Sequence, residues 1–347
     1  MFIKVKRLLK TVLPATILKH FSNLRKTTTN IQTLEGTIGE RTLKAIREVL
    51  PSTLKTCIWL VKITVLISLG ILILKYFNIL PWFSQLISPF FNVFGLPGEA
   101  ALAYVTGYFV NVYSAIAVIA TLDLDTRAIT ILSVMVLCSH NMIIETAVQK
   151  KTGSSAVRIV IIRTLSAFIL AFLLNLIMPG EVVSNVQHSQ IDKVSLTEML
   201  EDWFFSTLRV VLTMTVLIFS LSVLQKILSE FGIIRWLSKI MRPFLAIFGL
   251  PAKTSFLWIV ANTLGLAYGA AVMIEEYKSG KVTKKDIDLL NHHIAISHSN
   301  LEDIILLASV GGMLWWMLLS RWCMSLLLVW ELRCEMAIRK KLVKFAT

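Results

Sequence analysis

An internal repeat constrains the fold of this chain more than any other feature. The segment SHNMIIET at 139–146 returns as SHSNLEDI at 297–304, and FGLP at 94–97 returns at 248–251. A shift of 158 positions aligns the first pair and a shift of 154 the second, so the copies differ by one short insertion near 277–280. The chain is therefore two copies of one structural unit.

The composition places both copies in a membrane. The chain is 56% hydrophobic and 16% charged, and its apolar runs approach or exceed the roughly 20 residues that a helix needs to cross a bilayer. A soluble fold is excluded. In membrane proteins a doubled unit is typical of transporters, whose binding site forms between the repeats near the middle of the bilayer.

The net charge of +14 does not indicate nucleic-acid binding. The basic residues form no stripe with interleaved aromatic residues, and they lie at the chain ends and between apolar runs, where they orient a membrane protein. The four cysteines lack CxxC spacing, so they predict neither a disulfide framework nor a zinc knuckle. The expected partners are the lipid bilayer and a small polar solute or ion, with a homo-oligomer or a second membrane protein as further candidates.

We expect an all-α membrane protein with about five membrane segments in each repeat. The expected spanning helices are 56–74, 98–120, 127–148, 156–178, 203–226, 252–274, 287–308 and 312–332. Two shorter segments, 80–96 and 234–250, are interrupted by Pro89 and Pro243 and end in Gly-Leu-Pro. They are either short crossings or re-entrant elements.

The predicted domain order follows from these segments. A basic amphipathic region at 1–55 is followed by the first repeat at 56–178, an acidic non-cytoplasmic linker at 179–202, the second repeat at 203–332 and a basic cytoplasmic tail at 333–347. The amino-terminal region either lies on an anionic membrane face or is a flexible leader.

Lys and Arg orient the chain. If both short segments cross, 27 of these residues share one side and 4 lie on the other, and the basic side is cytoplasmic. Both termini are then inside, and the second repeat is inverted relative to the first. If the short segments are re-entrant, the acidic linker moves inside and the basic loop 149–158 outside, which the charge rule disfavours.

The two Ser-His pairs are the strongest candidates for a site. A polar side chain in hydrocarbon is costly unless it is partnered or lines a cavity. An imidazole there can hydrogen-bond a solute, relay protons or bind a metal, or it can be a neutral histidine bonded to a neighbouring helix. Recurrence in both repeats leaves these interpretations about equal. The predicted solute-binding residues are His140, Asn141, His298, Ser299 and Asn300, with Glu302 in ion or proton coupling.

The second repeat carries more polar residues than the first. Helical spacing places Asn291, His298 and Glu302 on one face and His292, Ser299 and Asp303 on the adjacent face. His298 and Glu302, one turn apart, could hold a divalent cation. Because no HExxH pattern is present, we predict no resident metal.

Two acid–arginine pairs recur, Glu145 with Arg163 and Asp303 with Arg321. Antiparallel helices bring each pair to a similar depth, so we expect a structural ion pair in each repeat, with a role in transport as the alternative. The Gly-Leu-Pro turns either mark broken helices whose free N–H groups receive polar ligands or are ordinary helix punctuation.

No P-loop, GxSxG or dinucleotide fingerprint is present, so we predict no enzyme and no cofactor, and energy would come from a gradient or a partner.

The chain resembles the Gate, or nucleoside-recognition, domain family of bacterial membrane proteins. The residues that carry the resemblance are FGLPGEAALAYVTGY at 94–108, SHNMIIET at 139–146, FGLPAKTSFLW at 248–258 and SHSNLEDI at 297–304. The family includes spore maturation membrane proteins and the paired gate regions of ferrous-iron transporters, and it is related to concentrative nucleoside transporters. The resemblance implies transport or gating of a nucleoside-like solute or an ion in the bacterial cytoplasmic membrane. Unlike the large ferrous-iron transporter, this chain has no GTPase domain, which argues against autonomous iron pumping.

Three hypotheses follow. The first is a two-repeat protein that moves or gates a small polar solute through a midplane site. The second is a divalent-metal permease that uses His298, Glu302 and Asp303. The third is a non-transporting scaffold in which the polar residues lock helices together.

Overall fold

The computed structural model describes residues 37–180 and 195–346, and these residues form helices and connecting loops without a strand. The chain divides into two compact units, 1–44 and 45–347. The described part of the first unit begins α3 (Ile38–Tyr76), where Thr37 N–H donates to Glu40 Oε2 at 2.8 Å and Glu40 N–H to Thr37 Oγ1 at 3.3 Å. These two bonds form a capping box. Most of the predicted amphipathic region and of the acidic linker lies outside the described residues.

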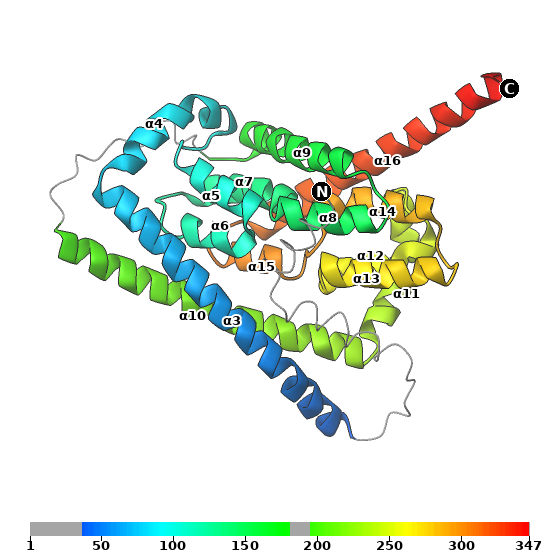
Figure 1. The fold of residues 1–347 in the computed structure, drawn as a ribbon, viewed down its shortest axis with the longest axis horizontal. Helices are drawn as coiled ribbons and strands as arrows, with labels where there is room; N and C mark the ends of the chain where they lie inside the picture. The colour runs from blue at the N-terminus through cyan, green and yellow to red at the C-terminus, as the bar shows by residue number, and fades with distance from the viewer. Residues whose placement is uncertain (1–36, 181–194, 347) are drawn as a thin grey trace, which may run out of the picture. The chain divides into compact units, whose positions relative to one another are not determined.

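The two repeats present the same elements in the same order (Figure 1). Each has a long helix, a short helix, a pair of packed short helices, a helix interrupted in its middle and a second long helix. The first repeat contains α3, α4 (Ile79–Phe91), η1 (Asn92–Phe94), α5 (Ala100–Phe109), α6 (Val112–Ile119), α7 (Thr126–Ser139), α8 (Met142–Lys151) and α9 (Ala156–Ile177). The second contains α10 (Leu196–Glu230), α11 (Ile233–Ile247), η2 (Ala252–Thr254), α12 (Ser255–Thr263), α13 (Leu266–Lys278), α14 (Lys284–Ser297), α15 (Asp303–Ala308) and α16 (Leu314–Ala346).

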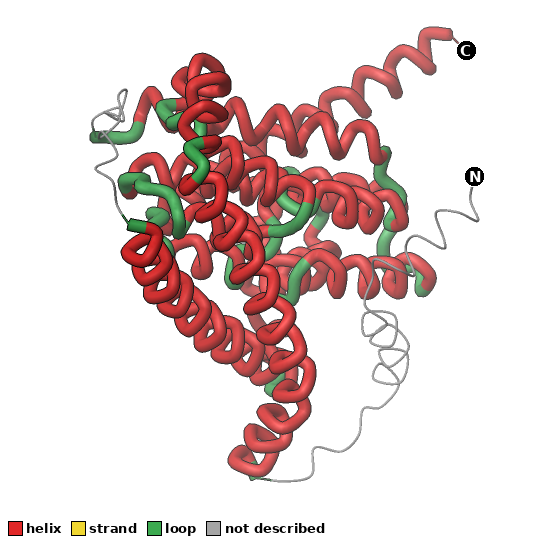
Figure 2. The backbone as a smooth tube through the Cα atoms, turned by 60° about the vertical axis from the view of Figure 1, so that its left-hand side comes forward, coloured by secondary structure: helices red, strands yellow, loops and turns green. Residues whose placement is uncertain are grey.

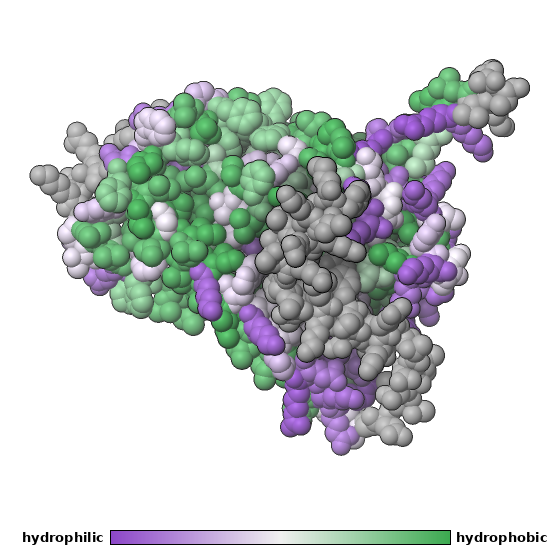
Figure 3. All heavy atoms as spheres, in the orientation of Figure 1, coloured by the Kyte–Doolittle hydropathy of each residue, from purple (hydrophilic) through white to green (hydrophobic). Residues whose placement is uncertain are grey.

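Four helical segments in the described part are long and apolar enough to cross a membrane. They are α3, the joined pair α7–α8, α9 and α10. Large apolar side chains of α3, α9 and α10 are exposed, among them Leu66, Leu165 and Val216, and Figure 3 shows apolar side chains gathered around α4, α5 and α6 while hydrophilic ones lie along the protruding part of α16. Exposed apolar surface on this scale fits a lipid environment.

Residues 98–120 and 252–274, predicted as single spanning helices, are helical hairpins. In the first, α5 ends at Phe109 and Asn111 caps α6 by accepting a hydrogen bond from Ser114 N–H at 2.8 Å. The arms pack closely, since a Cβ on Gly107 would lie 3.1 Å from the Cβ of Ala115. At about 1.5 Å per residue, neither arm is long enough to cross a bilayer alone.

The second hairpin, α12–α13, has the same packing with the small residues exchanged. A Cβ on Gly269 would lie 3.1 Å from the Cβ of Ala261, and Gly265 takes a φ of 86° between the arms. Glycine adopts this conformation without the steric cost that other residues bear.

The predicted helices 127–148 and 287–308 are interrupted at the Ser-His pairs. α7 ends at Ser139 and α14 at Ser297, and the following histidines are extended. The next residues, Asn141 and Ser299, occupy equivalent positions and take φ angles of 49° and 52°. Left-handed backbone is uncommon outside glycine, and it concentrates at functional sites.

The short segments 80–96 and 234–250 form α4 and α11, helices of 13 and 15 residues. Both end at Gly-Leu-Pro, where Gly95 and Gly249 take φ angles of 67° and 70°. Leu96 N–H donates to Phe91 O at 3.2 Å, and Leu250 N–H to Leu245 O at 2.8 Å. These are Schellman-type C-caps, so the Gly-Leu-Pro turns act as helix punctuation.

Packing across the repeats creates the interior. α7 and α9 contact α14 and α16, and the second arm of each hairpin packs on the other repeat, α6 on α15 and α13 on α8. Figure 2 shows helices packed together with short loop segments among them. The arrangement brings the two interrupted helices face to face.

Candidate functional site

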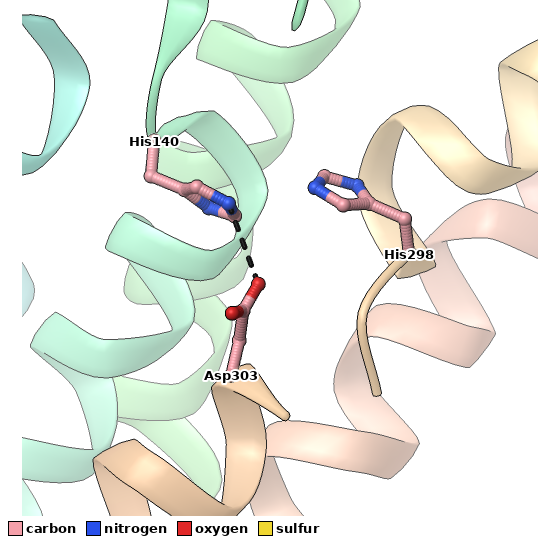
Figure 4. Close-up of side chains that lie close together, drawn as sticks. All are labelled: His140, His298 and Asp303. Atoms are coloured by element: carbon pink, nitrogen blue, oxygen red, sulfur yellow. Dashed lines mark ion pairs between the residues drawn. The ribbon is translucent and has the colours of Figure 1, made fainter. Parts of the chain in front are cut away.

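The two interruptions place His140 and His298 opposite one another. Their ring centroids lie 5.1 Å apart with the planes tilted by 39°, and the two imidazoles approach from different repeats (Figure 4). Their side chains are 5% and 1% exposed. The predicted histidine pair therefore forms one buried cluster.

Two buried arginines stabilise the interruptions in the same way. Arg163 donates from Nε to Cys138 O at 2.9 Å and from Nη2 to His140 O at 2.7 Å. Arg321 donates from Nε to Ile296 O at 2.6 Å and from Nη2 to His298 O at 2.7 Å. The last carbonyls of a helix have no partner within it, and the planar guanidinium, with donors in a rigid fork, satisfies two at once.

The hairpins bind the other side of each interruption. Asn141 N–H donates to Gly107 O at 2.9 Å, and Ser299 N–H to Ala261 O at 3.2 Å. In the second repeat, Leu301 N–H also donates to the carbonyl oxygen of Asn262 at 3.3 Å. The non-helical backbone is thus held by main-chain contacts from the hairpins, as backbone buried away from water requires.

Glu145 connects the two histidines. Its Oε1 lies 3.2 Å from His140 Nε2, and its Oε2 lies 3.1 Å from His298 Nε2. Arg163 Nη2 contacts Oε2 at 2.8 Å, which confirms the predicted Glu145–Arg163 ion pair. Sequence reasoning did not include Glu145 among the binding residues, although its alignment with Asp303 was a signal.

Asp303 approaches the same cluster from α15. Its Oδ2 lies 3.4 Å from His140 Nε2, the contact drawn in Figure 4. The predicted Asp303–Arg321 ion pair is wrong, because the carboxyl group of Asp303 faces His140 across the repeat boundary instead. Arg321 instead donates from Nη1 to Asn300 Oδ1 at 3.1 Å. Glu145 is one methylene longer than Asp303, so the two equivalent acids reach different partners.

The histidine ring protons can be assigned from geometry. His140 Nδ1 lies 3.1 Å from Val136 O, and His298 Nδ1 lies 2.8 Å from Ile294 O. A carbonyl oxygen only accepts, so each Nδ1 carries the proton and donates. In the neutral ring, each Nε2 then presents a lone pair to the carboxylates.

The remaining predicted residues divide between this cluster and its edge. Asn300 Nδ2 donates to Asn262 Oδ1 at 2.5 Å. Glu302 accepts from Tyr113 Oη at 2.5 Å and from Gln225 Nε2 at 3.2 Å. Glu302 therefore joins α6 and α10 to the second interruption and does not contact the histidines.

The predicted polar faces of the second repeat are wrong, because α14 ends before His298. Asn291 lies elsewhere and donates from Nδ2 to Thr152 Oγ1 at 2.7 Å and to Ser154 Oγ at 2.9 Å. Metal-ligating atoms in the described residues converge on His140, His298 and Asp303, whose ligand atoms lie within 4.8 Å of one another. This set replaces the predicted set of His298, Glu302 and Asp303.

Chemically, the cluster offers two imidazole nitrogens, two carboxylates and non-helical backbone in a buried setting. Such a group can hydrogen-bond a small polar solute, exchange protons or hold a cation.

Comparisons with known proteins agree with this architecture. A sequence model of the Gate family, described as nucleoside recognition, matches residues 57–179 and 211–325. The chain is 30% identical over 270 residues to the uncharacterized membrane protein YvoD of Bacillus subtilis (strain 168), an alignment that covers 76% of this chain and 85% of that protein. No solved structure matches the chain significantly.

Proposed function

The chain belongs to the Gate family, a transporter-like family of membrane proteins, and on that premise we propose that it moves a small polar solute through the site between its repeats. Both interruptions, both hairpin tips and the histidine–carboxylate cluster meet there. Non-helical backbone within a membrane is tolerated where it is buried in protein or lines a cavity, and repeat-built transporters bind substrate at such points.

The single observation that carries the proposal is the pair of hydrogen bonds between hairpin and interruption. Each hairpin meets the site through a main-chain hydrogen bond, Asn141 N–H to Gly107 O at 2.9 Å in the first repeat and Ser299 N–H to Ala261 O at 3.2 Å in the second. A hairpin held in this way can move away and expose the cluster on one side at a time. Alternating access requires such a movement around a fixed site.

The proposed topology has three full crossings in each repeat. The long helices and the interrupted helices cross, α4 and α11 lie in the interface, and the hairpins re-enter from opposite sides. Lys253 Nζ lies 2.6 Å from Asp286 Oδ2, which supports placing the start of the second hairpin on the basic side. With this topology 28 Lys and Arg residues lie on one side of the membrane and 3 on the other. The basic side is therefore cytoplasmic, and both termini are inside. The proposed location is the bacterial cytoplasmic membrane.

Each residue has a proposed role. His140 and His298 contact the solute, with Asn141, Ser299 and Asn300 beside them at the interruptions. Glu302, which Tyr113 and Gln225 hold at the edge of the cluster, takes part in ion or proton coupling.

The test is a thermal-shift screen of the purified full chain with uridine, adenosine and uracil, followed by uptake of any stabilising compound into proteoliposomes. A ligand that binds only the folded state raises the melting temperature in a concentration-dependent way. His140→Asn and His298→Asn keep a donor in the place of Nδ1 but remove Nε2. His292→Asn is the matched control, because His292 Nδ1 also faces a carbonyl, Asp288 O at 2.7 Å, away from the cluster.

We expect ligand stabilisation and uptake to be lost in the two cluster variants and kept in His292→Asn. Loss of folding in both cluster variants, with no uptake by the native chain, would favour the scaffold hypothesis instead.

A further inference from the structure

We propose that the cluster between the repeats is a binding site for a divalent transition-metal cation, with His140 Nε2, His298 Nε2 and the carboxylates of Asp303 and Glu145 as ligands. The inference rests on the proposed function and deepens it, since it names the chemical class that the site takes. The ligands come from both repeats, so the site exists only when the repeats are packed together.

Both imidazoles are oriented as metal-binding histidines are. Each Nδ1 donates to a backbone carbonyl of the preceding turn, Val136 O at 3.1 Å and Ile294 O at 2.8 Å. Metal-binding histidines almost always donate their second nitrogen to a carbonyl or a carboxylate, which fixes the tautomer and directs the free lone pair. Both Nε2 atoms are directed in this way into the cluster.

In the cluster, hydrogen-bond acceptors on the imidazoles face acceptors on the carboxylates. The Nε2 lone pairs meet carboxylate oxygens at 3.1 Å (His298 with Glu145), 3.2 Å (His140 with Glu145) and 3.4 Å (His140 with Asp303). His298 Nε2 is buried without a hydrogen-bond partner in the described part of the chain. Such contacts repel unless a proton or a cation lies between the partners.

The distances between the nitrogen and oxygen atoms also bear on metal binding. Metal–nitrogen and metal–oxygen bonds of about 2.0–2.2 Å in tetrahedral geometry separate neighbouring ligand atoms by about 3.3–3.6 Å. Three nitrogen–oxygen separations of 3.1 to 3.4 Å lie close to this range. The ligand atoms of His140, His298 and Asp303 lie within 4.8 Å of one another, so a bound metal would draw this set together. A mixed set of imidazole and carboxylate suits zinc, ferrous iron, cobalt or manganese rather than calcium or magnesium.

The balance of buried arginines and carboxyl groups around the cluster also matters. Arg163 neutralises Glu145 at 2.8 Å, but Arg321 donates to two carbonyls and to Asn300. Among the described residues no Lys or Arg lies within ion-pairing distance of Asp303, which faces His140 at 3.4 Å, and Glu302 is held by the neutral donors Tyr113 and Gln225. Arg163 and Arg321 together set two positive charges against the carboxyl groups of Glu145, Asp303 and Glu302, so the acids outnumber the arginines by one, which favours a cation.

The experiment is titration of the metal-free full chain in detergent with Co²⁺, followed by visible absorption spectroscopy and competition with Zn²⁺. We expect about one Co²⁺ per chain, with the intense d–d bands of a four-coordinate site that contains nitrogen ligands. His140→Asn and His298→Asn should lower the affinity by more than the roughly 10–100-fold that loss of an outer-shell partner costs. Asp303→Asn should weaken binding while the protein stays folded, and His292→Asn should bind as the native chain does.

Absence of Co²⁺ binding, or binding retained at native affinity in both cluster variants, would overturn the metal site. In that case a proton is the cation that separates the acceptors. The outcome is distinguishable from failure of the proposed function, because uptake by proteoliposomes is measured separately. Metal binding without uptake of metal or uridine would support the metal site and contradict the proposed transport function. Uridine uptake without metal binding would support transport and contradict the metal site.

Discussion

His140 of the first repeat and His298 of the second lie with ring centroids 5.1 Å apart, and Glu145 reaches both. This contact joins two segments that are 158 positions apart in the sequence. Through this contact, one residue segment from each repeat contributes to a single candidate site. The buried arginines and the hairpins hold the backbone that makes the contact possible.

Arg163→Lys and Arg321→Lys should each destabilise the protein by at least about 2 kcal/mol. A lysine cannot reach both carbonyls in the rigid fork that the guanidinium provides, and a buried acceptor left without a partner costs about 1–3 kcal/mol. Thermal unfolding of the purified variants measures the effect. Arg242→Lys on the exposed face of α11 is the control and should stay within about 0.5 kcal/mol of the native chain. Equal stabilities for all three variants would contradict the proposed role of the buried arginines.

Gly107→Ala should destabilise the first hairpin by about 1–3 kcal/mol, because the new methyl group would lie 3.1 Å from Ala115 Cβ and from Val136 Cγ1. Adding Ala115→Gly should recover part of the loss, since the second hairpin carries that reversed pair, Ala261 and Gly269. A double-mutant cycle of melting temperatures measures the coupling. Strictly additive effects would mean that the arms are not in close contact.

Tyr113→Phe should weaken the link between α6 and Glu302 by about 1.5–3 kcal/mol, the value of a hydrogen bond to a charged group. Tyr108→Phe is the matched control. It removes a neutral bond to Thr164 Oγ1 at 3.1 Å, so it should cost only about 1 kcal/mol. Thermal unfolding at neutral pH compares them, and a smaller effect at Tyr113 than at Tyr108 would contradict a strong Tyr113–Glu302 hydrogen bond.

Stability should also depend on pH through Asp286 at the start of α14. Burial raises the pKa of its carboxyl, but hydrogen bonds from Lys253 and Thr283 outweigh burial and hold the pKa below its ordinary value. A depressed carboxyl pKa stabilises the fold above the unfolded pKa of about 3.9, and this contribution is lost as the pH falls through the folded pKa.

Asp286→Asn should therefore cost about 1 kcal/mol at neutral pH, the usual value of a helix cap with a small addition from a partly exposed ion pair. The difference in melting temperature between the native chain and the variant should shrink below about pH 4. A difference that stays constant down to pH 3 would show that the charge of Asp286 does not contribute.

Much of this architecture could be predicted from the sequence. The repeat gave both copies of each element, and the Ser-His pairs marked the positions that become the site. The Glu145–Arg163 pair could be predicted because two antiparallel helices place these residues at a similar depth in the membrane. These features depend on spacing along one repeat, and spacing is visible in a sequence.

The hairpins and the interruptions could not be predicted in this way. Residues 98–120 form one apolar run, and only Asn111 marks the turn in it. The interruption at Asn141 has neither glycine nor proline, because arginine contacts from another helix stabilise it. Contacts across the repeats, such as His140 with Asp303, depend on how the copies pack, and side-chain length decides which acid reaches which histidine.

The most direct test of the central claim is whether the buried cluster becomes accessible in the membrane. In a chain whose four native cysteines are replaced, Asn141→Cys and Ser299→Cys are introduced singly and treated in proteoliposomes with a small membrane-impermeant thiol reagent. Val134→Cys, at a fully buried position of α7, is the control. The proposed transporter predicts that both cluster cysteines are labelled and that the control is not. If neither cluster cysteine reacts from either side while the protein stays folded, the cluster is a structural lock and the proposed function is wrong.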